Sequence, residues 1–211
     1  MKAHFVPARL SHLAASAGVL LLAVLQADVA HAWSLNLSPA TRRVFLHVGN
    51  GTANQDNSTV NLVQVSVPAA QVGNGVAQAM ASNSTQSTSL YGDGYTTCPT
   101  PSTQVMVGAS YQRNNNSSPA SATLRVTSPA SLVSAAGDTI PFSQISWTVS
   151  AAGSPVPGVI PAGTFSGTAQ TLATVPANTY IENCHTFSYA NSALRAAGTY
   201  TGQVTYTLTS P

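Results

Sequence analysis

Cys184 and His185 are direct neighbours in the sequence, and their side-chain types could act together in catalysis. A cysteine thiolate next to a histidine is a common pairing of nucleophile and general base. Successive residues of a strand point to opposite faces, however, so direct adjacency in an extended segment separates the two side chains. We therefore do not expect this pair to form a catalytic dyad.

Metal ligation and hydrolysis also require histidines and acids, and the chain has few of either. Beyond residue 32 its histidines and acids are His47, His185, Asp56, Asp93, Asp138 and Glu182. None of them forms an HExxH motif, and the chain has no CxxC motif. The alternation in "RRVFLHV" places His47 opposite the apolar set of that segment, so we expect it to face solvent. The sequence predicts no catalytic residue, no metal site and no cofactor, and hence a protein that is not an enzyme.

The first 32 residues have the three successive regions of a secretory signal peptide: a basic start, an apolar middle and small residues at the end. Lys2 and Arg9 precede an apolar run over residues 13–25, and "AHA" precedes Trp33. The run is short for a membrane span, which takes about 20 residues, and the small residues fit a cleavage site. We predict cleavage after Ala32, export, no transmembrane segment after cleavage, and a single domain over residues 33–211.

The exported part carries five arginines, four acids and no lysine. The net charge of the exported part is therefore close to zero, and the arginines form no basic stripe. This charge distribution does not support binding to nucleic acid. Both cysteines, Cys98 and Cys184, lie in this part, and cysteines of an exported chain usually pair. A disulfide closing a loop of 86 positions would stabilise the fold by roughly 4–5 kcal/mol. The alternative is two unpaired buried thiols.

Segments with alternating apolar residues recur along the whole chain, separated by clusters of Gly, Pro, Asn and Ser. They do not alternate with helical patterns, so we predict an all-β, antiparallel, immunoglobulin-like sandwich, with at most one short helix over residues 68–84. In "IPFSQISWTVS" the apolar parity changes, which predicts a bulge near Gln144. The last segment, "GTYTGQVTYTLTSP", is the most regular. Its apolar or small set is Tyr200, Gly202, Val204, Tyr206 and Leu208.

An exported sandwich with two cysteines and such a terminal strand resembles the subunits of chaperone–usher pili, or fimbriae. These pilins end in an alternating strand bordered by a glycine about fourteen residues from the carboxyl end, and Gly198 is in that place. They also have an alternating N-terminal extension. Residues 33–40, with Trp33, Leu35 and Leu37, match it, and "RRVFLHV" is a second candidate.

The resemblance implies assembly by donor-strand complementation. An incomplete pilin fold leaves an apolar groove beside its terminal strand, which a periplasmic chaperone fills first. At the outer-membrane usher, the extension of the next subunit then replaces the chaperone by β-strand addition. The partners would be neighbouring fibre subunits, the chaperone and the usher. The route would run through the periplasm to a cell-surface fimbrium that serves adhesion.

A self-contained extracellular β-sandwich that binds carbohydrate or protein is the alternative reading. In that case the segment "WSLNLS" would pair inside its own domain, and the protein would be a stable monomer. A fibre subunit would instead leave the edge beside its terminal strand open for a partner.

Overall fold

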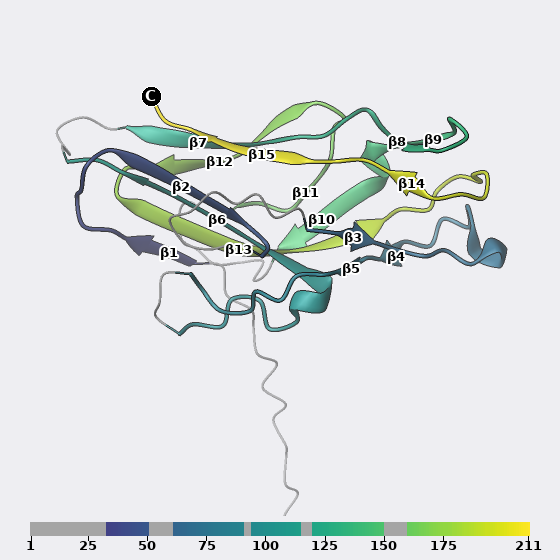
Figure 1. Cartoon of the computed structure of the whole chain (residues 1–211), viewed down its shortest axis with the longest axis horizontal. Coiled ribbons are helices and arrows are strands. Elements are labelled where there is room, and N and C mark those ends of the chain that lie inside the picture. The colour runs from purple at the N-terminus through teal and green to yellow at the C-terminus, as the bar shows by residue number, and fades with distance from the viewer. Residues whose placement is uncertain (1–32, 51–60, 91–93, 115–119, 150–159) are drawn as a thin grey trace, which may run out of the picture.

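The computed structural model describes residues 33–50, 61–90, 94–114, 120–149 and 160–211; the predicted signal peptide lies outside them. Within these residues, strands predominate and the helical segments are short 3-10 turns. Two layers of antiparallel sheet face each other, as Figure 1 shows. The predicted all-β sandwich is therefore confirmed.

The larger sheet is built around β13, an eleven-residue strand. Its strands run in the order β11-β10-β13-β6-β2, and β1 and β4 pair with β13 outside this path. Along one side of β13, β1 pairs with its first half and β10 with its second half. The bounds are β1 Trp33–Asn36, β2 Arg43–Val48, β4 Gln78–Ala79, β6 Gln104–Gln112, β10 Ile145–Val149, β11 Gly163–Thr164 and β13 Thr179–Tyr189.

The second sheet has the order β12-β7-β15 and packs over the first. Its strands are β7 Ser121–Thr127, β12 Ala169–Pro176 and β15 Thr205–Thr209. In β7, alternate residues are buried while Arg125 and Thr127 are exposed, as expected of a strand with one face in the core and one in solvent. The core between the sheets includes Val107, Leu124, Trp147, Phe165 and Ile181.

A third layer of irregular chain covers the outer face of the larger sheet. The disulfide Cys98–Cys184 attaches this segment to β13, and both cysteines are fully buried against Met106 of β6. The predicted pairing of the two cysteines is thus confirmed. Because both faces of β6 are covered, its seven central residues are all buried.

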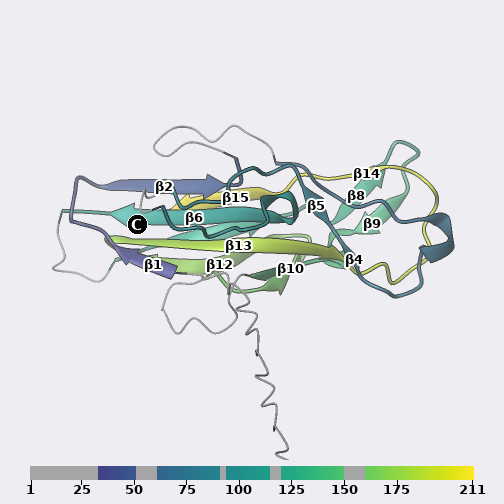
Figure 2. The same ribbon diagram turned by 90° about the horizontal axis from the view of Figure 1, so that it is seen from below.

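Smaller sheets extend the molecule at the end away from the C-terminus (Figures 1 and 2). One has the order β14-β8-β9, and the other pairs β3 with β5. The bounds are β3 Val63–Gln64, β5 Ala81–Ser82, β8 Ser131–Ser134, β9 Thr139–Pro141 and β14 Tyr200–Thr201. The 3-10 turns are Ala69–Gln71, Pro101–Thr103 and Phe142–Gln144.

Two local expectations are refined by these elements. The turn Ala69–Gln71 is the only helical piece within residues 68–84, all of which the structure describes. The parity change near Gln144 is a 3-10 turn instead of a bulge. This turn carries the chain from β9 in one sheet to β10 in another, so Ile140 and Ile145 never share a strand.

Candidate partner-binding edge

β15 is an edge strand, and its two faces differ as its sequence predicts. It pairs with β7 from Thr205↔Thr127 to Thr209↔Thr123. The threonines of β15 are exposed, whereas Val204, Tyr206 and Leu208 are half-buried and pack against the core. Burial raises the pKa of the Tyr206 phenol, so this side chain is neutral at physiological pH.

β2 is the edge strand of the facing sheet and pairs with β6 from Arg43↔Gln112 to Val48↔Val107. Its inward set resembles that of β15, because Leu46 and Val48 are half-buried and Val44 is 45% exposed. The structure therefore builds the segment "RRVFLHV", the second candidate extension, into the sandwich. In the described part of the chain no strand pairs with the outer edge of β2 or of β15.

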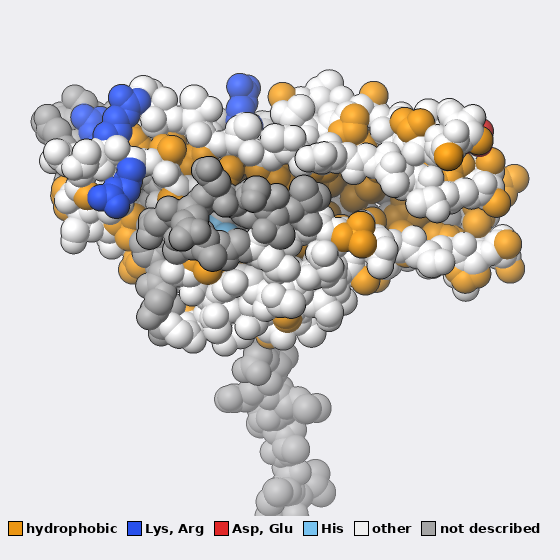
Figure 3. All heavy atoms as spheres, in the orientation of Figure 1, with side chains coloured by type: hydrophobic (Ala, Val, Ile, Leu, Met, Phe, Trp, Pro, Cys, Tyr) orange, Lys and Arg blue, Asp and Glu red, His pale blue; other side chains and the backbone are white. Residues whose placement is uncertain are grey.

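The two edge strands, β2 and β15, lie next to each other along one side of the molecule. Nη2 of Arg42, just before β2, donates a 3.0 Å hydrogen bond to Oγ of Ser210, just after β15. The start of β2 thus meets the end of β15, and the two strands run in opposite directions. Figure 3 shows hydrophobic side chains gathered in a band along this side. We call this region the open edge; it is lined by Val44, Leu46, Val48, Val204, Tyr206 and Leu208.

The predicted terminal strand is divided into two. Tyr200 and Thr201 form β14 and pair with β8, whereas β15 begins only at Thr205. Gly202 lies at this break, and a Cβ there would lie 2.6 Å from Cε2 of Phe142 and 2.9 Å from Cδ2 of Leu132. Gly202 is therefore a contact point of the core, and it offers no side chain to a partner.

Two other residues of the terminal set lie at the far end of this segment. Tyr200 is half-buried, and its hydroxyl donates a 2.8 Å hydrogen bond to the carbonyl of Ala196. Gly198 is exposed, and a Cβ built there would have Ser134 Cβ, at 3.7 Å, as its nearest neighbour. No positive φ requires a glycine at this position.

The predicted donor segment lies away from the open edge. β1 pairs antiparallel with β13 from Trp33↔Glu182 to Asn36↔Thr179, and the N–H of Leu37 donates to the carbonyl of Asn178. Leu35 is 36% exposed in this position and Leu37 is half-buried. β1 thus pairs with β13 through its backbone, and it does not place Leu35 in the core.

A buried polar cluster beneath the irregular layer was not expected. The carboxylate of Glu182 accepts hydrogen bonds from the hydroxyls of Thr97 and Tyr180, and further ones from Ser89 and the backbone of Leu90. Burial raises the pKa of Glu182, although the hydrogen bonds act in the opposite direction. These donors satisfy a buried acid, and none of them is a base poised for proton transfer.

The two histidines in the described part of the chain, His47 and His185, are buried, so the exposed position predicted for His47 is wrong. His47 lies on the outer face of the larger sheet, in register with Gly108 and Glu182, and is fully buried there. His185 faces the core and stacks on Trp147, with ring centroids 6.0 Å apart. Burial lowers the pKa of His185 to about 3. Cys184 and His185 point to opposite faces, as expected, and the cysteine is in the disulfide.

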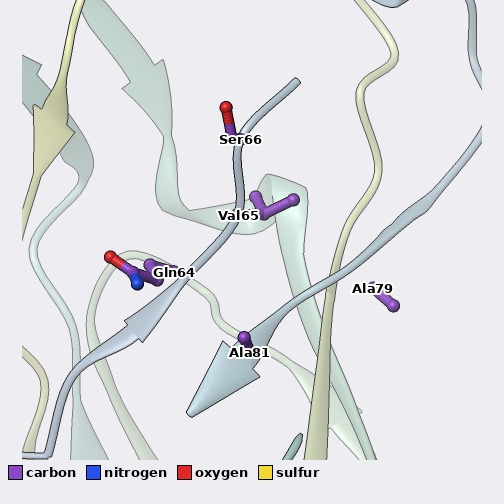
Figure 4. A pocket seen from close by; sticks show the side chains of 5 residues that line it. All are labelled: Gln64, Val65, Ser66, Ala79 and Ala81. Atoms are coloured by element: carbon purple, nitrogen blue, oxygen red, sulfur yellow. The ribbon is translucent and has the colours of Figure 1, made fainter. Parts of the chain in front are cut away.

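A cavity beside β3 and β5 has an uncharged lining. Figure 4 shows a space of about 420 Å³ where the chain after β3 diverges from β5; it is lined by Gln64, Val65, Ser66, Ala79 and Ala81. None of these side chains is titratable. Among the described residues no cluster of His, Cys, Asp or Glu is suited to a metal ion. A search of the same residues finds no helix long and apolar enough to span a membrane.

Comparisons of the chain with protein-family models, with curated proteins and with solved structures gave no match.

Proposed function

We propose that this protein is a structural subunit of an extracellular fibre and that its open edge receives a β-strand from a neighbouring copy. The observation that carries the proposal is β15, whose outer edge is paired with no strand in the described part of the chain, and which lies beside the edge strand β2 on the same side of the sandwich. Unpaired edges are templates for another strand, and proteins usually protect them. Here both edges are bordered by half-exposed apolar side chains, with the charged residues Arg42 and Arg43 only at the start of β2.

Residues 33–40 of another copy are the proposed donor. Trp33, Leu35 and Leu37 repeat every second residue, which is the period of the inward set of β15. Backbone hydrogen bonds to the strand edges would provide affinity, and the alternating side chains would set the register. Each large apolar side chain that becomes fully buried contributes about 1.5–3 kcal/mol. A three-residue apolar set therefore offsets part of the cost of associating and ordering the strand, and the backbone hydrogen bonds would have to supply the rest.

The fibre would be assembled outside the cytoplasm, in keeping with the signal-peptide pattern and the disulfide. The pilin resemblance further implies a periplasmic chaperone and an outer-membrane usher, with the chaperone covering the open edge before assembly. Adhesion would be a property of the finished fibre.

Peptide uptake by the purified residues 33–211 tests the proposal. A labelled peptide of residues 33–40 is mixed with the protein, and binding is followed by fluorescence anisotropy. Leu208→Asp places a charge in the open edge and should abolish uptake. Thr207→Asp places the same charge on the outer face of the same strand and should leave uptake unchanged. Deletion of residues 33–40 should prevent self-assembly while preserving peptide uptake.

A self-contained binding module remains the second candidate, favoured by the pairing of β1 with β13 of its own chain. It requires a protein that stays monodisperse and takes up no peptide. That outcome, with a cooperatively folded protein, contradicts the fibre proposal.

A further inference from the structure

A polar cavity lies between the turn that joins β8 to β9 and the segment that leads into β14, at one end of the molecule (Figure 1). It has a volume of about 420 Å³ and is lined by residues 137–139 of the turn, residues 194–196 of the segment, and Tyr200. Cavities that hold small ligands usually measure about 300–1,000 Å³. None of these residues lines the open edge, so the cavity is a separate candidate site.

Arg195 brings a positive charge to this cavity, and most of its hydrogen-bonding capacity is unused. Its Nη1 donates to the carbonyl of Thr139 at 3.3 Å, whereas its buried Nε has no acceptor. In the described part of the chain its guanidinium forms no ion pair. A guanidinium has five N–H donors, and a buried donor without an acceptor is costly. A carboxylate is the acceptor that fits the planar fork of an arginine best.

Asp138 brings the opposite charge to the same cavity. Its backbone is held in place, because its N–H donates to Oγ of Ser134 and its carbonyl accepts from the N–H of Ser134. Its side chain is exposed and forms no ion pair with Arg195. An ionised carboxylate only accepts hydrogen bonds, so the groups that match it are donors such as hydroxyls. Two opposite charges therefore line the cavity without neutralising each other.

The phenols close to Arg195 add no negative charge. Burial raises the pKa of Tyr189, and the positive charge of Arg195 acts against this effect. The hydroxyl of Tyr200 donates to the carbonyl of Ala196. Both phenols are therefore neutral at physiological pH, and they leave the charge of Arg195 available to a ligand.

These features select among the possible ligands. Asp138 repels a polyanion, and Arg195 repels a simple cation. An apolar ligand would cover both charges without pairing either, which is unfavourable. A sugar that carries one carboxylate satisfies both residues, because its carboxylate can pair with Arg195 while its hydroxyls donate to Asp138. Leu194, which also lines the cavity and is 80% exposed, offers an apolar contact to a sugar ring.

We propose that this cavity binds a uronic acid residue of an acidic polysaccharide, with Arg195 holding the carboxylate and Asp138 accepting hydrogen bonds from ring hydroxyls. The inference does not depend on the fibre proposal, because every residue that it uses belongs to one copy and none lines the open edge. In a fibre the site would be repeated along the length of the assembly. Repeated weak sites on one polysaccharide then give a much stronger attachment than one site alone.

Titration of ¹⁵N-labelled residues 33–211 with methyl β-glucuronide tests the inference by NMR. Methyl β-glucoside is the control ligand, because it has CH₂OH in place of the carboxylate and is otherwise the same. The Nε–H signal of Arg195, identified by its loss in Arg195→Lys, should shift with the glucuronide. The affinity for the glucuronide should exceed that for the glucoside by about tenfold or more, as expected of hydrogen bonds to a charged group.

Two variants and one matched control locate the binding. Arg195→Lys keeps the positive charge and loses the planar fork, and Asp138→Ala removes the acceptor of the hydroxyls. Each should weaken glucuronide binding by about tenfold. Arg125→Ala, at an exposed arginine on β7, should leave the affinity unchanged. The side chain of Asp138 has no hydrogen bond in the described part of the chain, so Asp138→Ala tests the site even if Arg195→Lys fails to fold.

Three results would overturn the inference. Equal affinities for glucuronide and glucoside would show that the carboxylate is not recognised. If acetate at the same concentration shifts the Arg195 signal as much as the glucuronide does, the cavity binds carboxylates and not sugars. Unchanged affinity in well-folded Asp138→Ala, checked by urea unfolding, would place the binding elsewhere. Failure to take up the 33–40 peptide refutes only the fibre proposal, because that uptake occurs at the open edge.

Discussion

Arg42 and Ser210 join the two strands that border the open edge, through a 3.0 Å hydrogen bond from guanidinium to hydroxyl. The two residues are 168 positions apart, so the bond connects the first part of the sandwich to its last residues. It lies at one end of the open edge, where β2 begins and β15 ends. A strand that enters between β2 and β15 must pass this bond or displace it.

Replacement of Arg42 by Ala should accelerate peptide uptake by several-fold while changing the free energy of unfolding by less than about 1 kcal/mol, because the bond is exposed. Ser210→Ala should have the same effect on uptake. Arg43→Ala removes an equal charge without removing the bond and serves as the control. Stopped-flow fluorescence with the labelled peptide gives the rates. If Arg43→Ala accelerates uptake equally, the faster uptake is caused by the lost charge and not by the lost hydrogen bond.

Gly202→Ala should destabilise the protein by about 1–3 kcal/mol, the usual cost of overpacking a core. The added Cβ would lie 2.6 Å from Phe142 and 2.9 Å from Leu132. Gly198→Ala is the matched control, because its Cβ has no neighbour closer than 3.7 Å. Denaturant unfolding of both variants measures the difference. Equal stabilities would mean that Gly202 is not a packing constraint.

The strands with one face in the core were predictable because their alternation is directly visible in the sequence. The inward set of β15 belongs to this group. The disulfide was predicted on other grounds, from two cysteines in a chain expected to be exported. Gly202 belonged to the same alternating set, yet alternation says nothing of Phe142, which lies 60 positions earlier and fills the space above it. The break between β14 and β15 therefore could not be read from the terminal segment alone.

The burial of His47 and Glu182 was not predictable from period-two patterns. Alternation gives the face on which a residue lies, but it does not say whether irregular chain covers that face. Over Glu182 this cover is the layer attached through Cys98, whose Thr97 and Ser89 bond the buried carboxyl. Cys184, two residues after Glu182, was the one available signal, since a disulfide on an outer face must bring a second segment over that face.

His185→Leu should remove an acid sensitivity of the fold. Burial holds the pKa of His185 at about 3, whereas the unfolded chain has the ordinary value of 6.5. Below pH 6.5 the unfolded state binds a proton that the folded state does not, so stability falls as pH decreases, by up to about 1.4 kcal/mol per pH unit. Urea unfolding between pH 4.5 and 7.5 should show this slope in the wild type and a smaller one in His185→Leu. If the slope is the same in His185→Leu, then His185 is not the source of the pH dependence.

Glu182→Gln should change the pH dependence in the opposite direction. Burial raises the pKa of this carboxyl above 4.5, so the folded state keeps a proton that the unfolded state has lost. The resulting stability is present below pH 4.5 and decreases as pH rises toward the folded-state pKa. Gln is neutral throughout, so the variant should lack this decrease in the same urea titration. A decrease that persists in Glu182→Gln would show that Glu182 is not its source.

A disulfide between Asn36→Cys and Thr179→Cys should fix β1 on β13 and stop assembly. These residues are opposite each other in the register of the two strands, within reach of a disulfide. The donor can then no longer leave its own chain, although the open edge remains accessible. The oxidised variant should take up the 33–40 peptide and fail to assemble, and mild reduction should restore assembly. Thr127→Cys/Thr205→Cys, which links β7 to β15, should assemble in both states. Assembly of the oxidised β1 variant would show that residues 33–40 are not the donor.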